Sequence, residues 1–262
     1  MKNVFLFSIS VIALAASICV AFAEEKAQSE QLEEITVTAT KKPRKVEEVP
    51  AAIDVITKED IERSKATNLG EVLEVLSGVQ AETKNGGYDT HIIIRGAGAK
   101  ASYGVREIMV MVDGIPITDP DSLTRLDVVD TSLIERIEVV KGPSSTLYGA
   151  NAAGGVINII TKSPLQYQGF SLRGGYGDNN TQDHHLQYGG NLKNLYFLLS
   201  LSRRSTDSWR EHNEFETNQF NTRINYIIND KSDLAFTFGY TKANLQLPGS
   251  LTKEHFESNP VR

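Results

Sequence analysis

Several residue types are scarce in this 262-residue sequence, and each scarcity narrows the function. The single cysteine, Cys19, excludes a disulfide framework and any metal site built from four thiolates. A formal net charge of −6 argues against a basic nucleic-acid-binding protein. Apolar residues make up 40% of the chain and charged residues 23%, which excludes wholesale disorder and predicts a folded protein.

Aromatic residues are scarce in one part of the chain and common in another. Residues 24–168 contain four of them, whereas residues 169–262 contain thirteen. This change in aromatic content indicates that two regions with different surroundings meet near residue 168.

Motifs of enzyme active sites are also missing: the sequence contains neither H-E-x-x-H nor G-x-S-x-G. Residues 96–101 fit the dinucleotide fingerprint G-x-G-x-x-A. However, Gly104 and a strand expected from Ile108 leave no room for a crossover helix, so we predict a tight loop. His184 and His185 are adjacent on a predicted strand and therefore point to opposite faces. We expect no enzyme, no metal site and no cofactor.

The first 23 residues have the pattern of a secretory signal peptide. Val4–Ala23 is an apolar run of 20 residues that closes on Ala21-Phe22-Ala23, a small-x-small cleavage pattern. The alternative is an uncleaved anchor, because such a run can span a bilayer. A lipoprotein is rejected because Ile18, and not a small residue, precedes Cys19. We expect export and a cysteine-free mature chain.

A short strand-forming box follows the signal sequence. Residues 33–40 alternate β-branched side chains without a break, and the basic linker 41–45 follows them. Such a segment near a flexible terminus can add onto the exposed sheet edge of another protein. It can equally be the first strand of the chain's own sheet, and composition alone does not decide between the two.

Residues 50–163 predict a compact α+β unit. Thr57–Asp60 and the pair Asn68 and Glu71 are helix-start signals, and Gly78 is placed to cap the second helix at its C-terminus. Apolar runs bounded by glycine, proline or polar residues predict strands. These runs are Ala52–Ile56, His91–Arg95, Ile108–Val112, Ile137–Val140 and Val156–Ile160.

Residues 169–262 contain segments in which apolar and polar residues alternate. We expect strands that begin near Phe170, Leu195, Phe220 and Leu234, with Thr181–Gly190 as a weaker fifth. Segments of about ten residues with one apolar face and aromatic tips are typical of transmembrane β-barrels. A soluble antiparallel sheet alternates in the same way. The export signal and the aromatic residues favour the barrel.

Five motifs together carry a family resemblance. The first is Glu34, Ile35, Thr36, Val37, Thr38 and Ala39; the others are Val49–Ile56, Ile92–Gly96, Val110–Pro116 and Ile134–Ile160. They resemble the TonB box and the successive plug signatures of TonB-dependent outer-membrane receptors. The resemblance covers residues 33–163 by motif and the remainder by barrel-like patterning only.

The resemblance implies a fold and a division of the chain. The expected fold class is an α+β plug domain followed by the N-terminal strands of an antiparallel transmembrane β-barrel, incomplete in this chain. The expected parts are a signal peptide (1–23), a periplasmic segment with the TonB box and basic linker (24–48), the plug (49–163) and the first four to five barrel strands (169–262).

The resemblance also implies an active-transport receptor of the bacterial outer membrane. Its ligand would be a scarce compound such as a ferric siderophore, cobalamin or another metal chelate. TonB, energised by ExbB and ExbD, would pair with the box and pull the plug. This favours the sheet-edge interpretation of residues 34–39. Membrane lipid is the other expected partner, and nucleic acid is not expected.

Some site residues follow from the matched motifs. Arg95 and Lys141 correspond to family positions that help to lock the plug to barrel carboxylates. Other members often have arginine at the second position, and lysine loses the bidentate fork, so we expect a weaker contact there. The ligand-facing loops would carry Tyr88, Tyr103 and Asp119.

The chain is short for such a transporter. Plugged barrels have 22 strands of about 9–11 residues each, or roughly 200 residues before loops, whereas 94 residues follow position 168. We therefore expect a fragment of a receptor. The alternative is a soluble periplasmic protein that consists mainly of the plug and binds without transporting.

Overall fold

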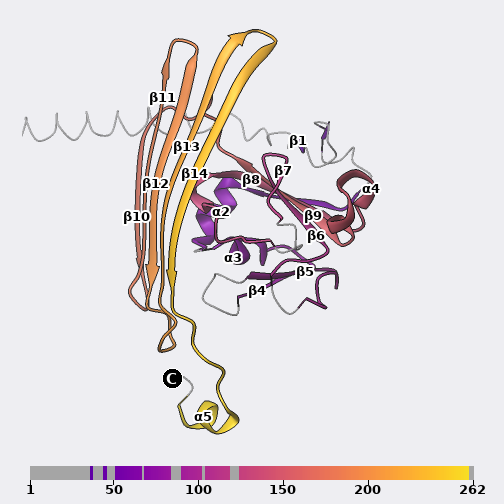
Figure 1. Cartoon of the computed structure of the whole chain (residues 1–262), viewed down its shortest axis with the longest axis vertical. Helices are drawn as coiled ribbons and strands as arrows, with labels where there is room; N and C mark the ends of the chain where they lie inside the picture. The colour runs from indigo at the N-terminus through magenta and orange to yellow at the C-terminus, as the bar shows by residue number, and fades with distance from the viewer. Residues whose placement is uncertain are drawn as a thin grey trace, which may run out of the picture. The chain divides into compact units, whose positions relative to one another are not determined.

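The computed structural model describes residues 36–37, 44–45, 51–66, 68–83, 90–101, 104–118 and 124–259. These residues belong to one compact unit, Thr36–Arg262. Their strands form two five-stranded sheets and two two-stranded sheets (Figure 1). Within the described part of the chain, no helix combines the length and the apolar character needed to cross a membrane.

The first five-stranded sheet organises an α+β unit, residues 51–163. Its strand order is β3-β8-β9-β6-β7, with β9 and β6 parallel and the other neighbours antiparallel. The parallel pair β6 and β9 consists of nearly continuous apolar runs because both faces of these strands are covered. The bounds are β3 (Ile53–Thr57), β6 (Ile108–Val112), β7 (Ile115–Pro116), β8 (Ile134–Lys141) and β9 (Gly155–Thr161).

Two short helices begin where the sequence predicts them. Thr57 caps α2 (Lys58–Ser64), and its side chain and that of Asp60 form a reciprocal capping box. Asn68 caps α3 (Leu69–Leu73) by accepting a hydrogen bond from the Glu71 amide. The helix ends at Leu73, so the prediction that Gly78 caps it is wrong. Gly78 instead has a positive φ of 75° and lies directly before β4.

A small sheet and one apolar cluster complete the α+β unit. Strands β4 (Val79–Thr83) and β5 (Thr90–Ile94) pair antiparallel. Side chains from both helices and both sheets form the main buried cluster, with Leu73, Ile92 and Ile137 fully buried. The remaining short elements are α4 (Ser145–Tyr148) and the 3₁₀ turns η3 (Thr131–Leu133) and η4 (Ala150–Ala152).

The segment that matches the dinucleotide fingerprint is a tight loop, as predicted. The backbone amides of Ile94 and Ala97 bond to each other's carbonyls at 3.0 Å. At Gly98, φ is +89° and an added Cβ would lie 2.5 Å from the Ile92 carbonyl oxygen, so only glycine fits. His91 Nε2 lies 2.9 Å from the Gly98 carbonyl oxygen, and the Glu107 carboxylate accepts the Gly98 amide at 3.0 Å. The loop is therefore held between β5 and β6.

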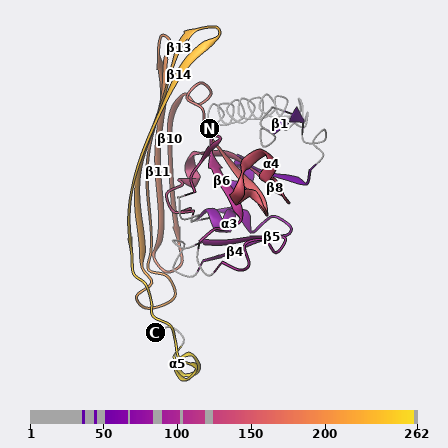
Figure 2. The same ribbon diagram turned by 45° about the vertical axis from the view of Figure 1, so that its right-hand side comes forward.

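The second five-stranded sheet, here called the long-strand sheet, contains the predicted alternating strands. They follow the chain order β10-β11-β12-β13-β14, and every neighbouring pair is antiparallel (Figures 1 and 2). The weaker fifth candidate is β11. The bounds are β10 (Gly169–Gly177), β11 (Thr181–Leu192), β12 (Leu195–Thr206), β13 (Phe215–Asn229) and β14 (Ser232–Leu245), and a short helix α5 (Lys253–Ser258) follows.

The two faces of the long-strand sheet differ in burial. On β12, Ser200, Ser202 and Arg204 are buried, whereas the alternate residues Leu199 and Leu201 are exposed. The strand period of two places these sets on opposite faces. The buried face is the polar one.

Candidate functional site: the contact surface between the α+β unit and the long-strand sheet

Asp130 is the centre of the polar contacts between the two regions. One carboxylate oxygen caps η3 by accepting the Ser132 amide at 3.0 Å and the Ser132 hydroxyl at 2.5 Å. The other oxygen accepts the Ser202 hydroxyl of β12 at 2.8 Å and the Asn221 amide of β13 at 3.4 Å. The Asp130 side chain is 1% exposed, so these donors replace the water that the carboxylate loses.

Arg204 of β12 supplies the positive charge beside Asp130. Its Nε donates to Asp183 of β11 at 3.0 Å, and one Nη donates to the Thr131 hydroxyl at 2.5 Å. The same Nη lies 3.8 Å from the Asp130 carboxylate. The arginine thus lies between a carboxylate of the sheet and one of the α+β unit, as buried charges require.

A second ion pair joins the two regions at the turn between β6 and β7. Asp113 accepts the Thr161 amide at 2.9 Å and the Thr161 hydroxyl at 2.7 Å, both from the end of β9. The Arg223 guanidinium of β13 lies 3.0 Å from Oδ2 of this carboxylate, the oxygen that also accepts the Thr161 hydroxyl. Arg223 also donates to the Lys162 carbonyl at 3.4 Å. The contact surface is therefore held by hydrogen bonds and charge pairs at two separate places.

Residues 162–168, which lead from β9 to β10, are held at a third place. The Lys162 ammonium donates to the Ser132 carbonyl at 2.8 Å and lies 5.3 Å from the centre of the Tyr167 ring. Burial lowers the pKa of Lys162 below its ordinary value. The Tyr167 hydroxyl donates to Glu135, and burial together with this hydrogen bond raises the tyrosine pKa.

The predicted lock residues Arg95 and Lys141 lie together in the α+β unit. The Arg95 guanidinium donates to the Lys141 carbonyl at 3.3 Å. The Lys141 ammonium donates to the Ser77 carbonyl at 2.6 Å and forms an ion pair with Asp54 of β3. The carboxylate that pairs with Lys141 in the structure, that of Asp54, thus belongs to the α+β unit. The contact of either residue with a barrel carboxylate stays a prediction.

The other predicted site residues are described only in part. The backbone of Thr36 and Val37 forms β1, which pairs antiparallel with β2, Arg44–Lys45. The rest of the predicted TonB box, Glu34, Ile35, Thr38 and Ala39, lies outside the described residues. So do the predicted ligand-facing residues Tyr88, Tyr103 and Asp119.

The residues that join the two regions were not predicted from the sequence. Asp130, Arg204 and Arg223 were not singled out, although both arginines lie at polar positions of the predicted alternating strands. The available signal was an arginine on the polar face of an alternating strand. The sequence does not indicate the carboxylate partner, because Arg204 and Asp130 are 74 positions apart and Arg223 and Asp113 are 110 positions apart.

Comparison with known proteins agrees with this arrangement. The family model described as the TonB-dependent receptor plug domain matches residues 45–156. Those residues are a TonB-dependent receptor plug domain. The α+β unit is therefore called the plug below. This match agrees with the predicted family, and the predicted fold class, an α+β plug followed by antiparallel strands, is confirmed.

Relatives and solved structures extend the likeness beyond the plug. The vitamin B12 transporter BtuB of Vibrio cholerae is 34% identical over 159 residues, which cover 60% of this chain and 25% of that protein. The BtuB of Vibrio vulnificus is 32% identical over 146 residues, 55% of this chain and 23% of that protein. The unliganded ferric citrate transporter FecA superposes with a TM-score of 0.69 at 24% identity, over 82% of this chain and 34% of that one.

A further structure is FpvA of P. aeruginosa in complex with a ferric pyoverdine, with a TM-score of 0.64 at 21% identity over 79% of this chain and 27% of that one. The matches span about a quarter of the B12 transporters. These relatives are outer-membrane transport receptors, which confirms the prediction that the chain is not an enzyme.

Proposed function

We propose that this chain forms the plug and the first wall strands of an outer-membrane receptor that takes up a scarce ligand with energy from TonB. The observation that carries the proposal is the polarity of the long-strand sheet. Its polar face meets the plug through Asp130 and Asp113, while its other face exposes leucine and aromatic side chains. A barrel wall with a polar interior and an apolar exterior has this distribution.

The proposed division of the chain is a signal peptide (1–23), a periplasmic segment with the TonB box (24–48), the plug (49–163) and wall strands (169–262). TonB, energised by ExbB and ExbD, would add a strand to the box. The backbone of Thr36 and Val37 supports this, because it is extended and, among the described residues, pairs with Arg44 and Lys45 alone. A strand from TonB would extend or replace this short pairing.

The polar character of the contact surface supports a plug that can move. Its hydrogen bonds, such as that between Ser202 and Asp130, can be exchanged for hydrogen bonds to water with little net cost. An apolar contact of the same area would lose its full burial energy on separation. Pulling on the plug therefore meets a smaller barrier than the burial of the side chains suggests.

The proposed ligand class follows the relatives: cobalamin, or a ferric siderophore or other metal chelate. BtuB is named for vitamin B12, FecA for ferric citrate, and FpvA is bound to a ferric pyoverdine. Tyr88, Tyr103 and Asp119 are the proposed ligand-facing residues of the plug.

The test replaces Val37 in the receptor that carries this chain. Val37→Pro removes the amide that a TonB strand would need, whereas Val37→Ile keeps it and serves as the control. Uptake of radiolabelled cobalamin, ferric citrate and ferric pyoverdine is measured alongside binding of the same ligands to outer membranes. We expect Val37→Pro to abolish uptake of the transported compound and to leave its binding intact. Unchanged uptake would remove the box from the mechanism.

Fractionation of cells that express only the 262 residues separates the two hypotheses from the sequence analysis. Recovery with the outer membrane agrees with wall strands that enter lipid. Recovery as a soluble periplasmic protein would support a plug that binds without transporting.

A further inference from the structure

Residues 162–168, here called the connector, are the covalent link between the plug and the long-strand sheet. The connector begins on the plug, where the Lys162 amide donates to the Leu133 carbonyl at 2.8 Å. It then turns on itself, and the Tyr167 amide donates to the Ser163 carbonyl at 3.1 Å. The connector therefore has a fixed conformation, and its last part presents Tyr167 to the surrounding elements.

The Tyr167 side chain contacts the plug at the start of α2 and at β8. The ammonium of Lys58, the first residue of α2, lies 5.0 Å from the centre of the Tyr167 ring, and that of Lys162 lies 5.3 Å from it. Both distances allow a cation–π attraction. The Tyr167 hydroxyl donates to Glu135, near the start of β8. These four side chains are called the clasp below.

The positive charges of the clasp are compensated by acidic neighbours. Burial and the Lys58 charge lower the pKa of Lys162. The carboxylates of Glu62 and Glu135 oppose that shift, because they favour the charged lysine. The clasp can therefore keep two ammonium groups beside one aromatic ring.

The backbone of Tyr167 lies against the long-strand sheet. At Gly189 of β11, an added Cβ would overlap the Tyr167 carbonyl oxygen, so the sheet has a glycine where the connector meets it. Gly189 pairs with Gly169, the first residue of β10, and with Leu198 of β12, which is 1% exposed. Tyr167 thus has its backbone on the sheet and its side chain on the plug.

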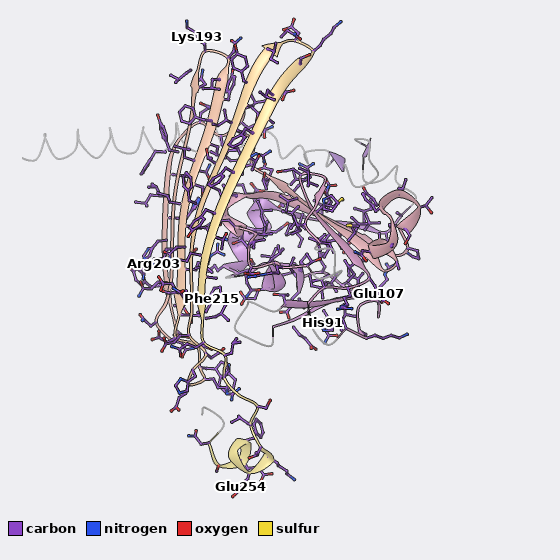
Figure 3. All side chains as sticks on the ribbon, viewed as in Figure 1. His91, Glu107, Lys193, Arg203, Phe215 and Glu254 are labelled. Atoms are coloured by element: carbon purple, nitrogen blue, oxygen red, sulfur yellow. The ribbon has the colours of Figure 1, made fainter. Side chains whose placement is uncertain are left out.

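The connector meets the sheet near the end that has the short turns. Residues 193–194 and 230–231 connect strands at this end, and the longer connection 207–214 lies at the other end. Figure 3 shows Lys193 at one end of the strands, and Gly189 is four positions before it. Outer-membrane barrels have short periplasmic turns. The clasp therefore lies towards the side from which TonB would pull.

We propose that Tyr167 is a positioning residue that couples α2 to the wall and keeps the connector end of the plug seated while the N-terminal segment is pulled. The proposal rests on the proposed function for the origin of the pull. A pull on Val37 passes along the chain to β3 and then to Lys58, because α2 follows β3 directly. There the clasp transfers load through the Tyr167 ring to the wall at Gly189. Lys58 and Tyr167 are 109 positions apart, so the contact bypasses most of the plug.

Hydrogen exchange followed by mass spectrometry tests the coupling in the purified 262-residue chain in neutral detergent micelles. In Tyr167→Leu, the amides of residues 162–168 and of α2 should exchange about tenfold to a hundredfold faster, because the ring contacts and the hydrogen bond to Glu135 are lost. Tyr167→Phe keeps the ring and should have a smaller effect. The matched control is Tyr226→Leu, which changes a 47% exposed tyrosine near the same end of the sheet. It should leave exchange in both segments unchanged.

Lys58→Met distinguishes coupling from a local role of Tyr167 in the connector. The substitution removes a charge from α2 and keeps an unbranched side chain. It should accelerate exchange in the connector, and it should add little to the effect of Tyr167→Leu when the two are combined, because contacting residues are not additive. Lys65→Met, at the exposed C-terminal cap of the same helix, is the control and should leave the connector unchanged.

Two results of the exchange experiment would overturn the proposal. One is equal exchange of the connector in Lys58→Met and in the unmodified chain, and the other is full additivity in the double variant. Circular dichroism checks that each variant has formed its strands. If Tyr167→Leu does not fold, Tyr167→Phe combined with Lys58→Met takes its place.

The receptor that carries this chain tests whether the clasp keeps the plug seated. Tyr167→Leu should increase the entry of vancomycin, a large antibiotic, measured as growth inhibition of cells with active TonB. The increase should disappear when Val37→Pro is added, and binding of cobalamin, ferric citrate and ferric pyoverdine should be unchanged. Unchanged entry of vancomycin in Tyr167→Leu would overturn the seating role. The exchange experiment needs neither TonB nor a transported ligand, so its failure is distinguishable from that of the Val37→Pro test.

Discussion

The plug buries its apolar side chains in its interior, whereas the long-strand sheet exposes its apolar side chains on its outward face. In the plug, Leu73 and Ile137 lie in a closed cluster away from solvent. In the sheet, Leu234 and Phe236 point outward, while polar side chains such as Ser200 are buried. Under the proposed function, the plug would lie in an aqueous lumen, and the long-strand sheet would meet lipid on one face and the polar surface of the plug on the other.

The difference explains why polar contacts join the two regions. The plug has already buried its apolar side chains in its own core, and the inner face of the sheet has few to offer. The contact surface therefore depends on charge pairs and hydrogen bonds at Asp130, Arg204 and Asp113. Four sets of variants test this comparison, from the largest expected effect to the smallest.

The largest effect is expected at Asp130. Asp130→Ala leaves the Ser202 and Asn221 donors and the Arg204 charge without their buried acceptor. The free energy of unfolding of the plug should therefore fall by about 3–5 kcal/mol. Asp130→Asn keeps the shape and some acceptors and should cost less. The urea concentration at which a protease cleaves the plug measures both. Equal values for Asp130→Ala and the unmodified chain would show that the contact surface does not depend on this carboxylate.

A matched pair of leucines tests the two apolar environments. Leu73→Ala opens a cavity in the plug core and should cost about 2–5 kcal/mol. Leu234→Ala, on the outward face of β14, should change stability by less than about 0.5 kcal/mol. Urea titration of the chain in detergent, followed by pulse proteolysis, compares the two. Similar losses of stability from the two substitutions would mean that the outward face of the sheet is packed against protein.

A charge on the outward face tests for lipid contact. Leu199 lies near the middle of β12 on the outward face, so Leu199→Arg should oppose insertion by about 2–4 kcal/mol. Leu192→Arg lies at the end of its strand, where the cost should be about 0–1 kcal/mol. Flotation with lipid vesicles measures the inserted fraction. If both arginines have the same effect, position along the strands does not correspond to depth in a membrane.

The smallest effect is local to the plug. Thr57→Ala removes the N-cap of α2 and should cost about 1 kcal/mol. Hydrogen bonds from the Thr57 hydroxyl and amide hold the pKa of Asp60 below its ordinary value of 3.8. Because the folded state binds the proton less tightly, this stabilisation is present above that value and is lost as the pH falls through the lower, folded pKa.

Acid titration of the plug, monitored by circular dichroism, checks the direction of this pH dependence of stability. Asp60→Asn should remove this part of the pH dependence, and the long-strand sheet should be unaffected. Persistence of the same acid dependence in Asp60→Asn would assign it to other carboxylates.

Local chemistry made much of the fold predictable. The helix starts at Thr57 and Asn68 use side chains three residues from their partners, so the sequence displays both halves of each cap. The five long strands follow from alternation within single segments. Strand β4 was missed because Val79–Thr83 carries the polar residues Gln80 and Glu82 and its partner strand begins at Thr90.

The candidate site was much less predictable. The motif around Lys141 was found, but its ion pair with Asp54 joins residues 87 positions apart through the pairing of β3 and β8. The contacts of Asp130 depend on how η3 meets β12 and β13. No pattern within one segment contains that information.

By itself, the sequence determined the order of the motifs, the helix caps and the alternation of the long strands. Only the tertiary structure decided which of the two alternating sets is buried. Alternation is symmetric between the faces of a strand, so it names two sets without saying what covers either one. Burial of the set containing Ser202, Arg204 and Arg223 follows from the plug that these side chains contact, while the set containing Leu199 and Leu201 remains exposed.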